Sequence, residues 1–219
     1  MTGQNTQKQI LAMIVLMFLG VAGLGAYVWF DDGRRVEATD KALIDDATRG
    51  AELFARNCRV CHGNDGLGSE GSPQLIGPAL NKPSNTLAYR SGNIGAFGTI
   101  QSRIHDTVSC GRNGTPMPPW AVAQGGSLNE FKVSMLVTLI TTNAGNTWEF
   151  ALEEALHEDE VAIGGLEAAV AEAHASGASE EAIANLEGLL ETAESRFEQG
   201  LPVGTPVASL TVDSCGQWS

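Results

Sequence analysis

Apolar residues form one long uninterrupted run near the start of the chain. Residues 10–30 carry no charged side chain and read ILAMIVLMFLGVAGLGAYVWF. At about 1.5 Å per residue, a helix of this length spans roughly 30 Å, the thickness of the hydrocarbon core of a bilayer. Tyr27 and Trp29 lie at the end of the run, where aromatic side chains favour the membrane interface. The pattern predicts a leader and transmembrane anchor at residues 1–30.

The competing interpretation of this run is a cleaved secretory signal. The run is longer than the apolar core of a usual signal, and no convincing small-x-small cleavage site follows before Asp31. We therefore favour the anchor, with the lipid bilayer contacted through residues 10–30. The polar residues 31–40 are expected to form a short linker.

Helical spacing returns after the linker. From Lys41 to His62, small and apolar residues recur at steps of three or four, which predicts an amphipathic helix. Glycine and proline are then dense up to Pro83 and predict an extended loop. Another apolar helix is expected from Leu128 to Thr142, so the whole chain is predicted to be all-α.

The C-terminal part carries the whole net charge of −13. Residues 149–199 hold 14 acidic side chains and one basic one, whereas the rest of the chain has 12 of each sign. Apolar positions in this part, Leu152 and Leu156 among them, step by three, four or seven, as in paired helices. Ser179 before two glutamates is typical of a helix N-cap. We expect an antiparallel helical hairpin with helices at 149–175 and 179–198, whose apolar stripes mostly pack against each other.

The hairpin has two interpretations. It is either a solvated acidic surface that keeps the protein soluble, or a docking element for a basic partner or a neighbouring subunit. The remaining residues, 200–219, are expected to form an extended tail. A nucleic-acid partner is not expected.

The strongest chemical motif is Cys58-Arg59-Val60-Cys61-His62. The C-x-x-C-H spacing is that of covalent c-type haem attachment, in which two thiols bind one porphyrin and the histidine binds its iron. A redox C-x-x-C and half of a zinc site are the alternatives. The chain has no second C-x-x-C, and its three other histidines lie far from the motif. We expect one covalent haem c, held by Cys58 and Cys61, with His62 as an iron ligand.

A sixth iron ligand is expected from a proline-rich segment. Met117 lies in Gly114-Thr115-Pro116-Met117-Pro118-Pro119-Trp120, where the prolines stiffen the backbone and exclude regular structure. A thioether ligand raises the reduction potential relative to a second histidine. Met117 is therefore the expected ligand, with His105 a distant second. The carbonyl of Pro78 is a candidate acceptor for the Nδ1–H of His62, which would fix the orientation of the ring.

Together these residues resemble the class I cytochrome c family over roughly half of the chain. The resemblance rests on Gly50 and Phe54 before the motif, on the loop from Gly77 to Leu80, on the Met117 loop and on the closing helix. It implies a helical haem domain at residues 41–148, with the first and last helices packed through Gly50 and residues such as Leu136. Many members carry an aromatic residue where this chain has Leu139. Candidate partners of the haem propionates, chosen by donor chemistry alone, are Arg90, Arg103, Arg112 and Trp120.

The expected function is one-electron transfer at the outer face of a membrane, with no catalytic side chain. Covalent haem attachment takes place outside the cytoplasm, so residues 31–219 are expected on the periplasmic side. Cys110 and Cys215 remain as a possible disulfide in that oxidising compartment. Redox donor and acceptor proteins and membrane electron-transport subunits are the expected partners.

A tethered monohaem cytochrome with a helical hairpin is also similar to the small cytochrome subunit of the quinol-oxidising alternative complex III. The alternative functions are a haem enzyme or a gas or peroxide sensor with a displaceable sixth ligand, and a mainly structural subunit.

Overall fold

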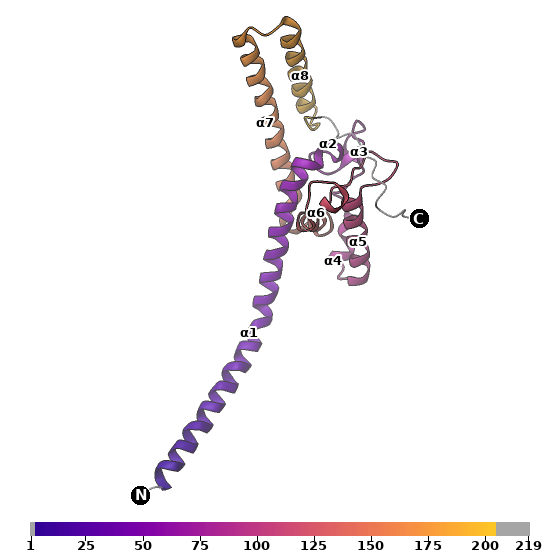
Figure 1. The fold of residues 1–219 in the computed structure, drawn as a ribbon. Coiled ribbons are helices and arrows are strands. Elements are labelled where there is room, and N and C mark those ends of the chain that lie inside the picture. The colour runs from indigo at the N-terminus through magenta and orange to yellow at the C-terminus, as the bar shows by residue number, and fades with distance from the viewer. Residues whose placement is uncertain (1–2, 205–219) are drawn as a thin grey trace. The chain divides into compact units, whose positions relative to one another are not determined.

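The computed structural model describes residues 3–204, with side chains from residue 7 onward except that of residue 32. This part of the chain consists of helices and loops, and its one β-type contact is an isolated bridge between Ala121 and Leu128 (Figure 1). The predicted all-α fold is confirmed. The chain divides into two units, Met1–Ala42 and Leu43–Ser219.

The first unit is part of a single long helix, α1 (Gly3–Asn57). It contains the predicted anchor, and none of its most apolar stretch is buried within the protein. Phe18 and Trp29, for example, are 66% and 83% exposed. Within residues 3–204, α1 is the one helix that is long and apolar enough to cross a membrane.

The predicted linker at residues 31–40 is helical, because α1 continues through these residues. This stretch has no proline, and its charges support a helix. Asp31 pairs with Arg34 at 2.7 Å and with Arg35, at spacings of three and four residues that face one another on a helix. Polarity alone led to the linker prediction, although the charges are arranged in a helical pattern.

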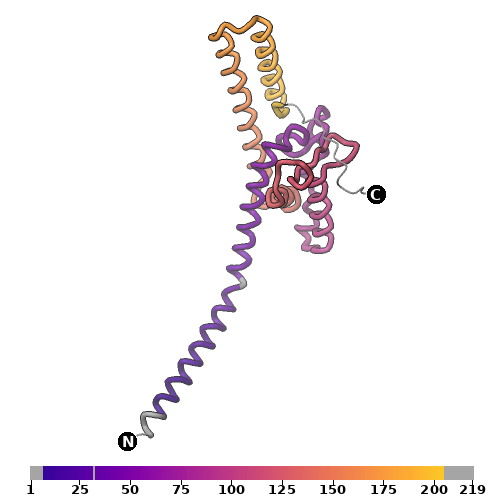
Figure 2. The backbone as a smooth tube through the Cα atoms, in the orientation of Figure 1, coloured from indigo at the N-terminus to yellow at the C-terminus, as the bar shows by residue number. Residues whose placement is uncertain are grey.

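The second unit contains the end of α1 and all the later elements (Figure 2). In chain order these are α2 (Arg59–His62), α3 (Gly68–Gly71), α4 (Pro83–Arg90), α5 (Ile94–Cys110), η1 (Val122–Gln124), α6 (Glu130–Thr142), η2 (Ala144–Asn146), α7 (Thr147–Ser176) and α8 (Glu180–Glu198). The extended stretch between His62 and Pro83 is mostly loop, as predicted, with the single turn α3 inside it.

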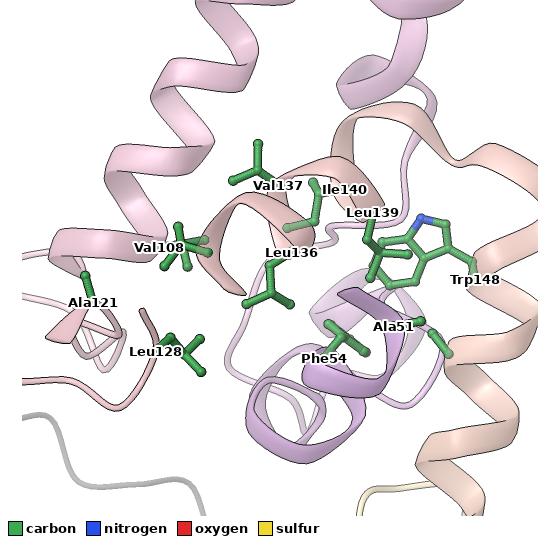
Figure 3. Close-up of a cluster of buried hydrophobic side chains, with 12 residues drawn as sticks. Ala51, Phe54, Val108, Ala121, Leu128, Leu136, Val137, Leu139, Ile140 and Trp148 are labelled. Carbon is green, nitrogen blue, oxygen red and sulfur yellow. The ribbon is translucent and has the colours of Figure 1, made fainter. Parts of the chain in front are cut away.

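The core of this unit forms where α1, α6 and the start of α7 meet (Figure 3). Phe54, Leu136 and Leu139 are almost completely buried there. Gly50 allows the close crossing of α1 and α6, because a Cβ at this position would lie 2.3 Å from the carbonyl oxygen of Met135. The predicted packing of the first and last haem-domain helices through Gly50 is therefore present.

The aromatic residue that completes this core comes from α7. The ring of Trp148 meets that of Phe54 edge to face, with centroids 5.1 Å apart and planes at 81°. This arrangement suits the ring quadrupoles. Ala151, one turn further on, is also fully buried in the same core. The haem-domain core therefore extends beyond residue 148 into the hairpin.

The acidic hairpin itself has nearly the predicted bounds, with α7 and α8 separated by a short turn. The side chain of Ser179 caps α8 by accepting the N–H of Ala182 at 3.3 Å, as predicted. The predicted apolar stripe is wrong for the first turns of α7. Leu152 and Leu156 are exposed, whereas Ala151, Ala155 and Asp159 are buried. Contact with the haem-domain core, rather than with α8, sets the rotation of this part of α7.

Candidate haem-attachment site

The C-x-x-C-H motif directly follows α1: Cys58 separates the end of α1 at Asn57 from the short helix α2. The N–H of Cys58 donates to the carbonyl of Phe54 at 2.8 Å, and the N–H of His62 donates to that of Cys58 at 3.0 Å. Cys58 and Cys61 are both free thiols, half-buried and one helical turn apart. We call residues 58–62 the attachment turn.

His62 is held in one orientation by the loop that follows. Its ring is buried, and Nδ1 lies 2.8 Å from the carbonyl oxygen of Pro78. Since a carbonyl only accepts, Nδ1 carries the proton and Nε2 keeps the lone pair that a metal needs. Burial lowers the pKa of His62, while the hydrogen bond to Pro78 acts in the opposite direction. The neutral form, which is the form that ligates, is therefore favoured.

The loop reaches His62 because glycine leaves room for it. The N–H of Gly77 donates to the carbonyl of Cys61 at 2.9 Å. A Cβ at Gly77 would lie 2.7 Å from both that oxygen and Nδ1 of His62. Gly68, with a φ of +51°, approaches the loop from the other side, and a Cβ there would lie 2.2 Å from the carbonyl oxygen of Gly77. These contacts fix Pro78 against the ring.

The two thiols are protonated at neutral pH. Burial, together with the neighbouring Cys61, raises the pKa of Cys58 from 9.0 to about 12. Burial also raises the pKa of Cys61. Two neutral thiols one turn apart, beside a histidine with a free Nε2, match the donor set that holds a c-type haem. The residues of the attachment turn therefore fit this group.

The Met117 loop is tied to the end of α5. The N–H of Arg112 donates to the carbonyl of Met117 at 3.0 Å, and the N–H of Met117 lies 3.3 Å from the hydroxyl of Thr115. Gly111, at a φ of +69°, lets the loop approach, since a Cβ there would lie 2.6 Å from Pro118. The loop is fixed and Met117 is half-buried. Its role as iron ligand stays a prediction.

The alternative ligand, His105, is engaged elsewhere. Its Nε2 lies 2.5 Å from a carboxylate oxygen of Glu130 at the start of α6, and its Nδ1 lies 3.6 Å from Asp106. Glu130 engages Nε2, whereas 3.6 Å is too long for a hydrogen bond from Nδ1 to Asp106. The contact with Glu130 favours Met117 over His105 as the sixth ligand.

The candidate propionate partners are spread over several elements. Arg90 ends α4, Arg103 lies in α5 and Arg112 lies in the Met117 loop, all three exposed, whereas Trp120 is half-buried against the core. Within residues 3–204, no hydrogen bond or ion pair joins these three arginines to the attachment turn. Their contact with a haem stays a prediction.

A buried polar cluster beside the attachment turn was not anticipated. Arg59, between the two cysteines, forms an ion pair with Asp159 of α7. Asp159 also accepts the side-chain N–H of Asn64 at 2.9 Å and the backbone N–H of Val203 at 2.8 Å. We call these four residues the Asp159 cluster. The sequence does carry one signal for its burial: Asp159 follows Ala151 and Ala155 at steps of four residues, so all three lie on one face of α7.

The cysteines outside the attachment turn were expected to pair. Cys110, at the end of α5, is disulfide-bonded. Its predicted partner, Cys215, lies outside the described residues, as does the tail from residue 205. Residues 201–203 of the predicted tail are buried and non-helical.

Comparison with known proteins supports the haem domain. Residues 45–130, about two fifths of the chain, match the family model for cytochrome c oxidase, cbb3-type, subunit III. The cbb3-type cytochrome c oxidase subunit CcoP of Rubrivivax gelatinosus is 37% identical over 76 residues, which are 35% of this chain and 20% of that protein. Subunit FixP of Azorhizobium caulinodans is 31% identical over 101 residues, 45% of this chain and 28% of that protein. No solved structure gives a significant match.

The matched region contains the attachment turn and the Met117 loop. The resemblance of this region to a cytochrome c domain is therefore confirmed. The chain spans only about a fifth to a quarter of the length of these curated relatives. They are named as oxidase subunits, a different type of complex from the quinol-oxidising assembly suggested by the hairpin.

Proposed function

We propose that this chain transfers single electrons through one haem c, covalently attached to Cys58 and Cys61 and ligated by His62. The observation that carries the proposal is the attachment turn, where two free thiols lie beside a buried histidine whose Nδ1 is committed to Pro78. When bound, the haem supplies an iron that gains and loses one electron. His62, buried and held by Pro78, would hold that iron in a fixed orientation.

Met117 would supply the second protein ligand of the iron, beside His62. Its backbone is fixed to Arg112 and Thr115, so the thioether is held in place by the loop rather than by a helix. Thioether ligation favours the ferrous state and raises the reduction potential. With His62 and Met117 both holding the iron, the site would transfer electrons instead of binding a gas or a peroxide.

The proposed setting is a respiratory complex of a membrane. The anchor in α1 would hold the haem domain at the membrane surface, with the domain on the periplasmic side, where covalent haem attachment occurs. The relatives that are subunits of cbb3-type oxidases support an electron-transport assembly. The partners would then be membrane subunits and a soluble redox protein. A disulfide between Cys110 and Cys215 would fasten the C-terminal tail to the haem domain.

Replacement of Met117 tests this function. We expect Met117→Ala to remove the ferric absorption band that is typical of Met–Fe ligation and to lower the reduction potential. Met135→Leu is the matched control, because Met135 is buried in the core of α6 and a change to leucine nearly conserves volume. The control should retain the wild-type spectrum and potential.

Two outcomes would contradict the proposal. Purified chain without covalent haem, measured by its absorption after denaturation in alkaline pyridine, would exclude a c-type cytochrome. Ready binding of carbon monoxide to the wild-type ferrous protein would show an open iron site and support the enzyme or sensor alternative.

A further inference from the structure

Asp159 of α7 is the most completely buried charged residue of the part of the chain that the structure describes. It is 0% exposed, and the side chain of its ion-pair partner Arg59 is only 8% exposed. One carboxylate oxygen of Asp159 accepts from Arg59 and from the N–H of Val203, and the other accepts from Asn64. Both oxygens are therefore satisfied, by three donors from two stretches of the chain, residues 59–64 and residue 203.

The positions of these donors relate the cluster to the haem. Arg59 lies between the two cysteines of the attachment turn, and Asn64 follows the iron ligand His62 by two residues. The turn thus contains a buried positive charge whose balancing negative charge comes from α7, 100 residues further along the chain. No other part of the hairpin contributes a fully buried charge within residues 147–198.

We infer that Asp159 is a positioning residue for the haem: it neutralises Arg59 inside the attachment turn and so keeps the reduction potential of the iron lower than an unpaired Arg59 would make it. This inference rests on the proposed function, because it needs a haem attached at Cys58 and Cys61. It gives the acidic hairpin a role in setting the electron-transfer site itself.

The sign of the effect follows from electrostatics. Reduction of the iron lowers its positive charge by one unit, so a nearby unbalanced positive charge favours the ferrous state and raises the potential. Charges in a protein interior are screened far less than charges in water. The charges of an ion pair largely cancel at the iron, whereas Arg59 or Asp159 alone would act on the iron with a full unit charge.

Three variants test the inference in the full haem-loaded chain. Asp159→Asn leaves Arg59 unpaired and should raise the reduction potential by about 59 mV. This shift corresponds to a roughly tenfold change in the equilibrium constant with a one-electron mediator. Arg59→Gln leaves the negative charge and should lower the potential. The double variant should return close to the wild-type value. A loss of packing alone would give neither opposite shifts nor their cancellation.

Glu158→Gln is the matched control. It changes the net charge by the same amount at the adjacent position, but Glu158 pairs with the exposed Arg56 at 3.0 Å, where solvent screens both groups. Its potential should stay near that of the wild type. An equal shift in Glu158→Gln and Asp159→Asn would overturn the inference, because net charge alone would then explain both.

Haem content and unfolding midpoint are measured for every variant. If Asp159→Asn loads no haem, the double variant with Arg59→Gln tests the inference instead, because it also removes the unpaired charge of Arg59. Restored haem loading with a wild-type potential supports charge balance, and failed loading overturns it. Haem-loaded single variants with unchanged potentials also overturn it and leave the proposed function intact. Absence of haem from the wild type would instead contradict the proposed function.

Discussion

The thiols of Cys58 and Cys61 should make the stability of the haem-free chain depend on pH, because burial raises the pKa of both. Before haem attachment, the pKa of Cys58 in the folded chain is about 12, against 9.0 for an ordinary thiol. Between these values the unfolded chain releases a proton that the folded chain retains. Stability is therefore fully present below pH 9 and decreases as the pH rises toward 12, by at most about 1.4 kcal/mol per pH unit for this one group.

This effect should appear only while the thiols are free. Chemical denaturation of the haem-free chain at pH 8 and pH 10, followed by circular dichroism, should show a lower free energy of unfolding at pH 10. The same chain with Cys58→Ser and Cys61→Ser is the control and should show a smaller decrease, since serine does not titrate in this range. Equal decreases in the two chains would mean that other groups cause the alkaline loss.

Contact between α1 and α6 depends on the missing side chain of Gly50. In Gly50→Ala the new Cβ would approach the backbone oxygen of Met135 to 2.3 Å, and backbone cannot rotate away as a side chain can. The helices must separate, which should cost about 1–3 kcal/mol of unfolding free energy, as in other overpacked cores. Urea denaturation of the haem-loaded protein measures this loss.

The control for this change is Gly98→Ala in α5. No atom lies within 4 Å of a Cβ at Gly98, and the residue is inside a helix. Alanine there should stabilise the protein by about 0.5–1 kcal/mol, because it restricts the unfolded chain more than glycine does. A destabilisation of similar size in both variants would argue against a close crossing at Gly50.

Local sequence signals were sufficient where neighbouring residues determine the structure. The C-x-x-C-H motif, the Ser179 cap and the apolar spacing of α6 each depend on residues within a few positions of each other. The bond from His62 to Pro78 was also foreseeable, because a metal-binding histidine usually donates its other N–H. These features account for the attachment turn, α6 and the helical hairpin, whereas α4 and α5 were not predicted.

The rotation of α7 could not be predicted in the same way. Leucines at 152 and 156 suggested one buried face, but the contact of Trp148 with Phe54 turns a face of alanines and Asp159 inward. That contact joins residues far apart in the sequence, so no local pattern records it. The spacing of Asp159 after Ala151 and Ala155 is a local signal for its burial, but its partner Arg59 lies 100 residues away, so the sequence does not pair the two.

At the scale of the whole molecule, the hairpin has two distinct parts: the buried first turns of α7, which include Asp159, and an exposed acidic surface. The first turns of α7 belong to the haem-domain core, so deletion of residues 149–199 would disturb the site as well as the acidic surface. The remaining acidic side chains are mostly exposed. Any role in attracting a basic redox partner must therefore be tested by neutralising exposed charges that lie away from Asp159.

Glutamine substitutions on the hairpin surface provide this test. We choose four exposed glutamates on α7 and α8, namely Glu167, Glu172, Glu191 and Glu194. If the hairpin attracts a basic partner, the rate of electron transfer to a basic soluble cytochrome should fall about tenfold at low ionic strength, because electrostatic steering is lost. At high salt, where steering is screened, the variant and the wild type should react at similar rates.

The matched control neutralises four exposed carboxylates of α1, namely Glu37, Asp40, Asp45 and Glu52, as the corresponding amides. Both variants change the net charge equally, so only the location of the charge differs. Stopped-flow rates over a range of salt concentrations should show a flatter salt dependence for the hairpin variant than for the α1 variant. Identical salt dependences in the hairpin variant and the wild type would assign the acidic surface to solubility, because a partner drawn to the hairpin must respond to the loss of its charge.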